Sequence, residues 1–333
     1  IFAHSEFTAF SQSVKKRFEK WKTKNTEQLK EIQKGDKPKK LIELISEDIL
    51  QLFLNAPLID TYDIYQHLMS YWSDTMQDDV YMIVSDRWKK AAKLQLLIDE
   101  ENKKSKEKAD IVVGKMKYKA ELIPPALVIA RYFAAEKEAI EKLETDAEAI
   151  SQQLEEMIAE HSGEEGWLEE ISEAKGKTAA ALLKERIAEL EKQQTPLKMV
   201  AEPIAVYNAN RLDGHNEADE LTILKNYARL IEQEAEANRK LKEAQKELDR
   251  KVVTKYGALS VEEIKTLVVD DKWLAKLEAD MQTELDRISQ ALTGRIRQLT
   301  ERYSTPLPKL TEEVETLSDR VDEHLKKMGF KWK

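Results

Sequence analysis

The chain has 333 residues, of which 35% are charged and 41% hydrophobic, and its formal net charge is −9. With only 9 Gly and 8 Pro, it favours long helices over turn-rich β structure, and its apolar content argues against wholesale disorder. The absence of cysteine excludes disulfides and thiolate metal sites. No apolar run approaches the roughly 20 residues of a membrane helix, and no signal peptide is visible. Because the chain begins at Ile1 inside an amphipathic segment, we expect a truncated or processed protein.

Charge is unevenly distributed along the chain. Residues 1–120 hold 22 Lys and Arg against 19 Asp and Glu, whereas the remaining 213 residues hold 32 against 44. Affinity for duplex DNA comes mainly from neutralising phosphates, so we expect any nucleic-acid contact to be local and confined to the first third. The acidic remainder predicts solvated helix faces or a surface for a protein partner.

Residues 1–100 predict a compact helical subdomain. Apolar residues recur at three- and four-residue steps over 4–34, and a turn containing Gly and Pro ends this helix. A second helix is expected at 39–54. A third begins after Asp60, whose side chain suits an N-cap, with Asp63 three residues later as in a capping box.

Residues 101–123 predict a basic connector and a short β-hairpin. In the hairpin, Lys115, Lys117 and Lys119 would share one face, while Met116 and Tyr118 would share the other. A basic connector beside a β-ribbon can lie along phosphates without reading bases, although a merely solvated loop and hairpin face also explains the pattern. The candidate DNA backbone contacts are Lys103, Lys104, Lys106, Lys115, Lys117 and Lys119.

Residues 124–256 predict a long antiparallel helical hairpin with a tip insertion at 163–216. The first helix is expected to run uninterrupted to about His161, with a heptad seam of apolar residues. Its partner, 218–256, has the same pattern, but the register slips after Ala235, which predicts a local distortion. A short helix is expected within the tip, near 178–192.

Residues 257–333 predict a C-terminal helical bundle. One helix has apolar residues eleven apart between Leu274 and Tyr303, so it should be nearly straight. Prolines then end it, and a last heptad-like helix follows. Two such stripes cannot both be buried by these helices alone, so they must pack on the helical hairpin, on the first subdomain or on another chain. The candidate partner interface is Leu310, Val314, Leu317, Val321, Leu325 and Met328.

The predicted fold class is therefore mainly α. A helical subdomain is followed by a long antiparallel coiled-coil hairpin and C-terminal helices, with at most one short β-hairpin.

Four segments of the chain resemble one known family. They are the aromatic-rich block 58–83 and the blocks 121–136, 263–273 and 324–330. Together they resemble the region after the catalytic domain in modification (DNA methyltransferase) subunits of type I restriction-modification systems. In that family a specificity subunit selects the DNA sequence, and its spacer helices pack against the C-terminal helices of the modification subunit. The resemblance implies a cytoplasmic assembly with a specificity subunit, a restriction subunit and double-stranded DNA, without a membrane.

The chain has no residues for methyl transfer. Binding S-adenosylmethionine would require a Gly-rich turn after a strand, and none of the 9 glycines forms G-x-G. The adenine-flipping motif Asn-Pro-Pro-aromatic is absent, because Pro124-Pro125 lacks both the Asn and the aromatic residue. The resemblance thus implies a non-catalytic region without a cofactor, in a parent that transfers methyl from S-adenosylmethionine to adenine N6.

Other candidate sites have simpler explanations. Asp60, Asp63 and His67 share a helix face and could hold a cation, but a helix cap and a surface histidine explain them better. The pairs Asp78-Asp79 and Asp270-Asp271 suit solvated helix ends better than acid-base catalysis. An alternative function is a free-standing coiled-coil scaffold or adaptor without enzymatic activity. That alternative leaves the aromatic block 62–81 unexplained.

Overall fold

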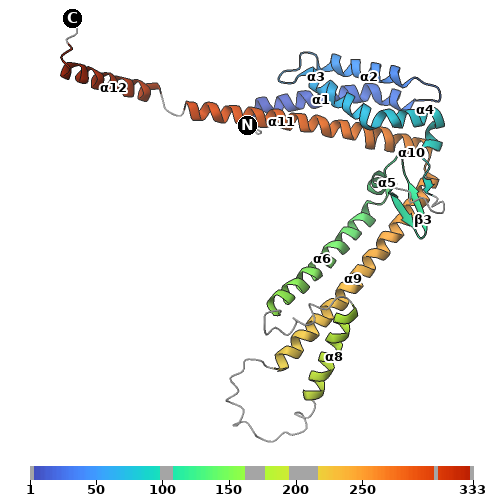
Figure 1. Ribbon diagram of the computed structural model, residues 1–333. Coiled ribbons are helices and arrows are strands. Elements are labelled where there is room, and N and C mark those ends of the chain that lie inside the picture. Colours follow the sequence, from blue (N-terminus) through green and yellow to red (C-terminus); the bar gives the residue numbers. More distant parts are fainter. Residues whose placement is uncertain (1–3, 98–107, 162–176, 195–216, 304–306, 331–333) are drawn as a thin grey trace, which may run out of the picture. The chain divides into compact units, whose positions relative to one another are not determined.

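The computed structural model describes residues 4–97, 108–161, 177–194, 217–303 and 307–330 (Figure 1). Of these described residues, 83% are helical and 4% lie in strands, which confirms the mainly α class. The chain forms two compact units, one of residues 1–93, 121–123 and 259–333, the other of 94–120 and 124–258. The first unit thus joins the predicted N-terminal subdomain to the predicted C-terminal helices.

The N-terminal part of the first unit consists of successive helices. They are α1 (Ser5–Lys30), α2 (Pro38–Phe53), α3 (Thr61–Tyr71), η1 (Trp72–Met76) and α4 (Gln77–Ala91). The Asp60 side chain accepts a hydrogen bond from the Tyr62 amide at 2.9 Å, which confirms the predicted N-cap of α3. Asp63, expected to complete a capping box, instead pairs with Arg287 of a later helix.

Three of the four buried tryptophans in the core of the first unit donate their indole N–H to an acceptor in another segment. Trp21 Nε1 donates to the Ile45 carbonyl and Trp88 Nε1 to the Ile32 carbonyl, both at 2.9 Å. Trp273 Nε1 donates to Asp79 at 2.8 Å, and its ring lies 6.4 Å from that of Trp88. Because these three buried N–H groups are hydrogen-bonded, their side chains add apolar burial at a reduced desolvation cost.

The C-terminal part of the first unit begins at a capping box. Ser260 Oγ accepts from the Glu263 amide while the Glu263 side chain accepts from the Ser260 amide. The elements are α10 (Val261–Lys265), η3 (Thr266–Leu274), α11 (Ala275–Arg302) and α12 (Leu307–Lys327). The π-helical segments η1 and η3 were not predicted. The wider turns of η3 allow five of its nine residues to be buried.

The second unit contains the helices of the predicted hairpin. They are α5 (Pro125–Tyr132), α6 (Ala134–His161), α8 (Lys177–Gln194) and α9 (Glu217–Ala258). The expected uninterrupted helix from Pro124 to His161 was wrong, because Phe133 leaves helical geometry at φ −132°, ψ 32° and separates α5 from α6. Helix α8 lies where a short helix was predicted in the tip; the rest of the tip lies outside the described residues.

Helices α6 and α9 pack antiparallel along their length. Ser151 donates to Glu234 at 2.6 Å, and Lys251 lies 3.2 Å from Glu136. An earlier residue of α6 thus pairs with a later residue of α9, so the two helices run in opposite directions. Residues of the predicted α6 seam are buried or half-buried. At the register slip Ala235 is exposed, yet α9 continues unbroken to Ala258, so the slip changes which residues face α6. Whether the pair is a true coiled coil stays a prediction.

A small antiparallel sheet completes the second unit. The predicted hairpin is formed by β2 (Ile111–Val113) and β3 (Met116–Lys119), and an unpredicted strand, β1 (Gln95–Leu97), pairs with the other edge of β3. Ile111 lies opposite Tyr118, and Val112 lies opposite Lys117. The buried Ile111 and half-buried Tyr118 thus mark the inner face of the sheet, and Val112 and Lys117 mark the outer face.

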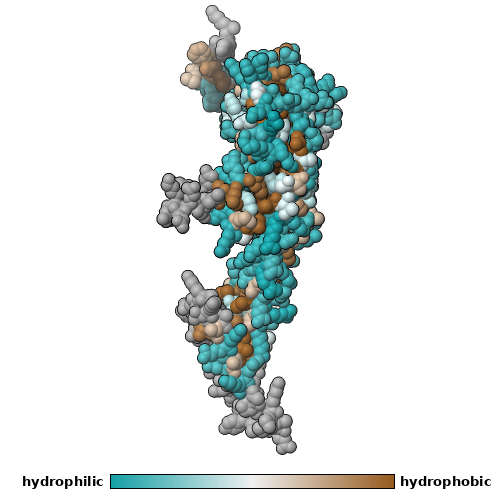
Figure 2. All heavy atoms as spheres, turned by 90° about the vertical axis from the view of Figure 1, so that its right-hand side faces the viewer, coloured by the Kyte–Doolittle hydropathy of each residue, from teal (hydrophilic) through white to brown (hydrophobic). Residues whose placement is uncertain are grey.

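The molecular face drawn in Figure 2 is predominantly hydrophilic, with hydrophobic residues gathered in patches. Within the described part of the chain, no helix combines the length and the apolarity needed to span a bilayer.

Candidate functional site

The predicted partner interface lies on α12 and on Met328 directly after it, and it is largely exposed to solvent. We call its six residues the α12 stripe: Leu310, Val314, Leu317, Val321, Leu325 and Met328. Val314, Leu317 and Val321 are 64%, 57% and 56% exposed, and only Leu325 is half-buried. The opposite side of the helix is charged, so α12 is an amphipathic helix whose apolar side is uncovered in this structure. Such a surface is typical of a docking helix.

The apolar stripe of α11 passes from the core to the surface. Leu277, Met281, Leu285 and Ile288 are buried, whereas Leu292 is half-buried and Ile296, Leu299 and Tyr303 are exposed. The eleven-residue repeat is the same throughout, so the change reflects where neighbouring helices end. Residues 292–303, called the α11 tail, therefore provide a second uncovered apolar surface.

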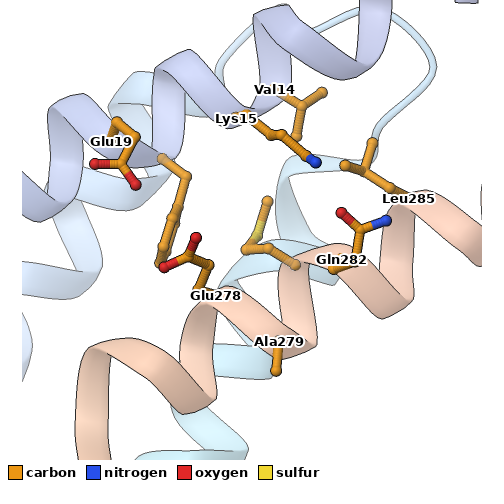
Figure 3. A pocket seen from close by; sticks show the side chains of 9 residues that line it. Val14, Lys15, Glu19, Glu278, Ala279, Gln282 and Leu285 are labelled. Atoms are coloured by element: carbon orange, nitrogen blue, oxygen red, sulfur yellow. The ribbon is translucent and has the colours of Figure 1, made fainter. Parts of the chain in front are cut away.

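Two grooves lie beside α11. One, of about 380 Å³, is lined by residues of α1 and α11, including Val14, Lys15, Glu278 and Leu285 (Figure 3). The other, also about 380 Å³, is lined by His4, Glu6, Phe7, Phe10, Leu58, Leu292 and Ile296. Both are lined largely by apolar side chains, which suits packing against another apolar surface better than chemistry.

The predicted DNA-contacting lysines divide between described and undescribed residues. Lys103, Lys104 and Lys106 lie outside the described residues. Lys115 occupies the two-residue turn beside Gly114, whose φ is +62°, as such hairpin turns require. The prediction that all three lysines share one face of the hairpin was wrong for Lys115, because Lys115 lies in the turn and not in a strand. Lys117 and Lys119 do share the outer face of β3, with Lys117 exposed and Lys119 half-buried.

A buried polar cluster joins three segments of the first unit. Lys272 Nζ lies 2.6 Å from Asp79 Oδ2 and donates to the Leu122 carbonyl at 2.7 Å, while Trp273 Nε1 donates to the same carboxylate. Burial raises the pKa of the Asp79 carboxyl, and the neighbouring Lys272 ammonium opposes that rise. The cluster connects α4, η3 and the segment before α5. Each buried charge has a partner, so its geometry is that of a structural clasp.

Asp79 was predicted to be a solvated helix end, and its burial corrects that expectation. Asp79 is 3% exposed. In the other predicted pair, Asp270 lies 2.6 Å from Lys30. Neither aspartate pair therefore presents two free carboxylates for acid-base chemistry.

A second ionic cluster surrounds the buried Glu284. Arg287 donates to both carboxylate oxygens of Glu284, at 2.8 and 2.5 Å, and also to Asp63 at 2.9 Å. His67 Nε2 lies 3.8 Å from Glu284. The arginine occupies the space between the acids, and no group of three or more potential metal ligands is found among the described residues. Asp63 thus contributes to an ion-pair cluster between α3 and α11, and His67 lies beside it.

Comparisons with family models, with curated proteins and with solved structures found no match to this chain.

Proposed function

We propose that this chain is a non-catalytic assembly region of a type I restriction-modification methyltransferase subunit. In this proposal it docks on the specificity subunit and helps to hold double-stranded DNA. The observation that carries the proposal is the exposed α12 stripe, supported by the sequence resemblance. An amphipathic helix with its apolar side in water gains about 25 cal/mol for each Å² of apolar surface that a partner helix covers.

The proposal places the specificity subunit on the α12 stripe and the adjoining α11 tail. Both surfaces lie on helices, which supports recognition by helix-on-helix packing. The outer face of the sheet, with Lys117 and Lys119, would contact DNA phosphates without reading sequence. S-adenosylmethionine and the catalytic residues would belong to the parent, which would methylate adenine N6 in the cytoplasm, and a restriction subunit would complete the assembly.

The partner interface is tested by co-purification with the specificity subunit. Leu317→Asp places a charge in the centre of the α12 stripe and should reduce recovery of the partner at least about tenfold. Thr316→Asp is the matched control, because it adds the same charge on the exposed opposite side of the helix. Equal recovery by both variants would refute docking through the α12 stripe.

The DNA contact is tested by the salt dependence of binding. Replacing Lys115, Lys117 and Lys119 with Gln should reduce the slope of log K against log salt by up to about three, since each phosphate contact contributes about 0.9. The control variant also loses three positive charges, by Lys142→Gln in α6 and by Lys240→Gln and Lys246→Gln in α9. Equal slopes for the two triple variants would remove DNA from the proposal.

The alternative function, a free-standing scaffold or adaptor, is favoured by the α6–α9 pair and the exposed α12 stripe. The intact mass of the protein made from its own gene separates the two functions. A mass well above 38.5 kDa, with S-adenosylmethionine binding, is expected for the methyltransferase subunit. A mass equal to that of this chain, without binding, would favour the scaffold.

A further inference from the structure

The α12 stripe has the heptad pattern of a two-stranded coiled coil. With Val314 at position a, Val321 and Met328 also fall at a, while Leu310 and Leu317 fall at d. β-branched residues at a with leucine at d favour two parallel strands. The remaining d position is His324, whose polarity weakens such a seam. This order of residue types is more specific than amphipathicity alone, because it favours a two-stranded coiled coil over other ways of covering the apolar side of α12.

We propose that α12 pairs with α12 of a second copy of this chain, as a parallel two-stranded coiled coil. The pairing uses the surface that the proposed function assigns to the specificity subunit, but it does not depend on that assignment. If both hold, the specificity subunit must displace the second copy.

The charges of α12 are arranged so that two identical helices can meet. Most of its acidic residues lie at positions b, c and f, away from the seam; these are Glu312, Glu315, Asp319, Asp322 and Glu323. At the flanking g positions Glu313 would face Ser318 of the second copy, and Arg320 would face Leu325. No like charges are therefore opposed across the seam, although α12 is acidic overall.

The length of α12 sets the strength of the pair. Its 21 residues provide three heptads, which is short for a stable coiled coil, so the dimer should be weak and depend on concentration. Ile296 and Tyr303 of the α11 tail are also exposed, but they belong to a separate helix, so the proposed seam is that of α12 alone.

The first test is the mass of the full 333-residue chain in solution, measured by sedimentation without the specificity subunit. Over about a hundredfold range of concentration, the mass should rise from 38.5 kDa towards twice that value. Leu317→Asp should remain monomeric, and Thr316→Asp should dimerise like the parent sequence. Circular dichroism verifies that both variants are folded. A chain that stays monomeric at every concentration would overturn the proposal.

The second test determines orientation and uses the absence of cysteine from the chain. In a parallel pair the two copies of residue 314 face each other, so Val314→Cys should form an intermolecular disulfide under mild oxidation. Glu312→Cys, at the outer position f, is the matched control and should cross-link far less. A dimer that cross-links through position 312 but not 314 would refute the parallel seam. Because the specificity subunit is absent from both tests, either proposal can fail without the other.

Discussion

Asp79 and Lys272 are 193 residues apart in the sequence, yet their charged groups lie 2.6 Å apart in the core of the first unit. The Lys272 ammonium also donates to the Leu122 carbonyl, and Trp273 Nε1 donates to the Asp79 carboxylate. One ion pair therefore joins segments from three distant parts of the chain. Its removal should affect the whole first unit, because each partner would lose its only buried counter-charge.

Asp79→Asn should lower the free energy of unfolding by about 3 kcal/mol, because the Lys272 ammonium would remain buried without a counter-charge. Urea denaturation followed by tryptophan fluorescence measures the change. Asp78→Asn, at the exposed neighbouring position, is the control and should change stability by less than about 0.5 kcal/mol. Equal losses in the two variants would mean that the buried pair contributes little.

Arg87 has a backbone conformation that glycine adopts more easily. Its φ of 64° and ψ of 157° interrupt α4 in a region costly for any residue with a side chain. Arg87→Gly should therefore raise the free energy of unfolding by about 1 kcal/mol. Ser85→Gly, in the regular part of the same helix, should instead lower it by about 0.5 kcal/mol. Thermal unfolding of the two variants should show shifts of opposite sign.

The α11 stripe permits a matched comparison of a buried and an exposed isoleucine. Ile288 is 7% exposed and Ile296 is 47% exposed. Ile288→Ala should lower the free energy of unfolding by about 3 kcal/mol, because it creates a cavity in the core. Ile296→Ala should cost less than about 1 kcal/mol in the isolated chain. Similar losses would indicate that another part of the chain covers the α11 tail in solution.

Two glycines in the second unit should respond oppositely to alanine. An added Cβ at either Gly114 or Gly257 would meet no atom within 4 Å, so only the backbone distinguishes them. Gly114 has φ +62°, and Gly114→Ala should cost about 1 kcal/mol. Gly257→Ala lies within α9 and should stabilise by about 0.5 kcal/mol. Hydrogen exchange of the Asp110 amide, which donates to the Tyr118 carbonyl, should become faster only in Gly114→Ala.

The long helices could be predicted because their apolar periodicity is local information. The predicted helix at 39–54 and the N-cap at Asp60 correspond closely to α2 and to the start of α3. The clasp between Asp79 and Lys272 could not be predicted, since nothing in a single sequence pairs two charges 193 positions apart. Strand β1 was missed for a related reason: three residues are too few to show a period, and their partner β3 is distant in sequence.

The π-helical segments were missed because their cause is tertiary packing. An α-helix has 3.6 residues per turn, and a wider turn leaves no signature in a pattern read at that spacing. The break at Phe133 was missed for the opposite reason, since good helix formers on both sides gave no signal of an interruption. For the candidate interface, the identity of the α12 stripe could be predicted, but its partner could not.

The π-helical turns of η3 absorb extra residues without changing the phase of the helix that follows. The i→i+5 hydrogen bonds of a π turn enclose one residue more than the bonds of an α turn. Deleting a single residue from 266–274 should therefore let the segment relax to α geometry while Leu277 and Leu285 stay in the core. In the regular part of α11 each residue advances the helix by about 100°, so a deletion at Ala279 would turn Leu285 and Ile288 away from the core. A change of one residue in length should thus be tolerated in η3 and not in α11.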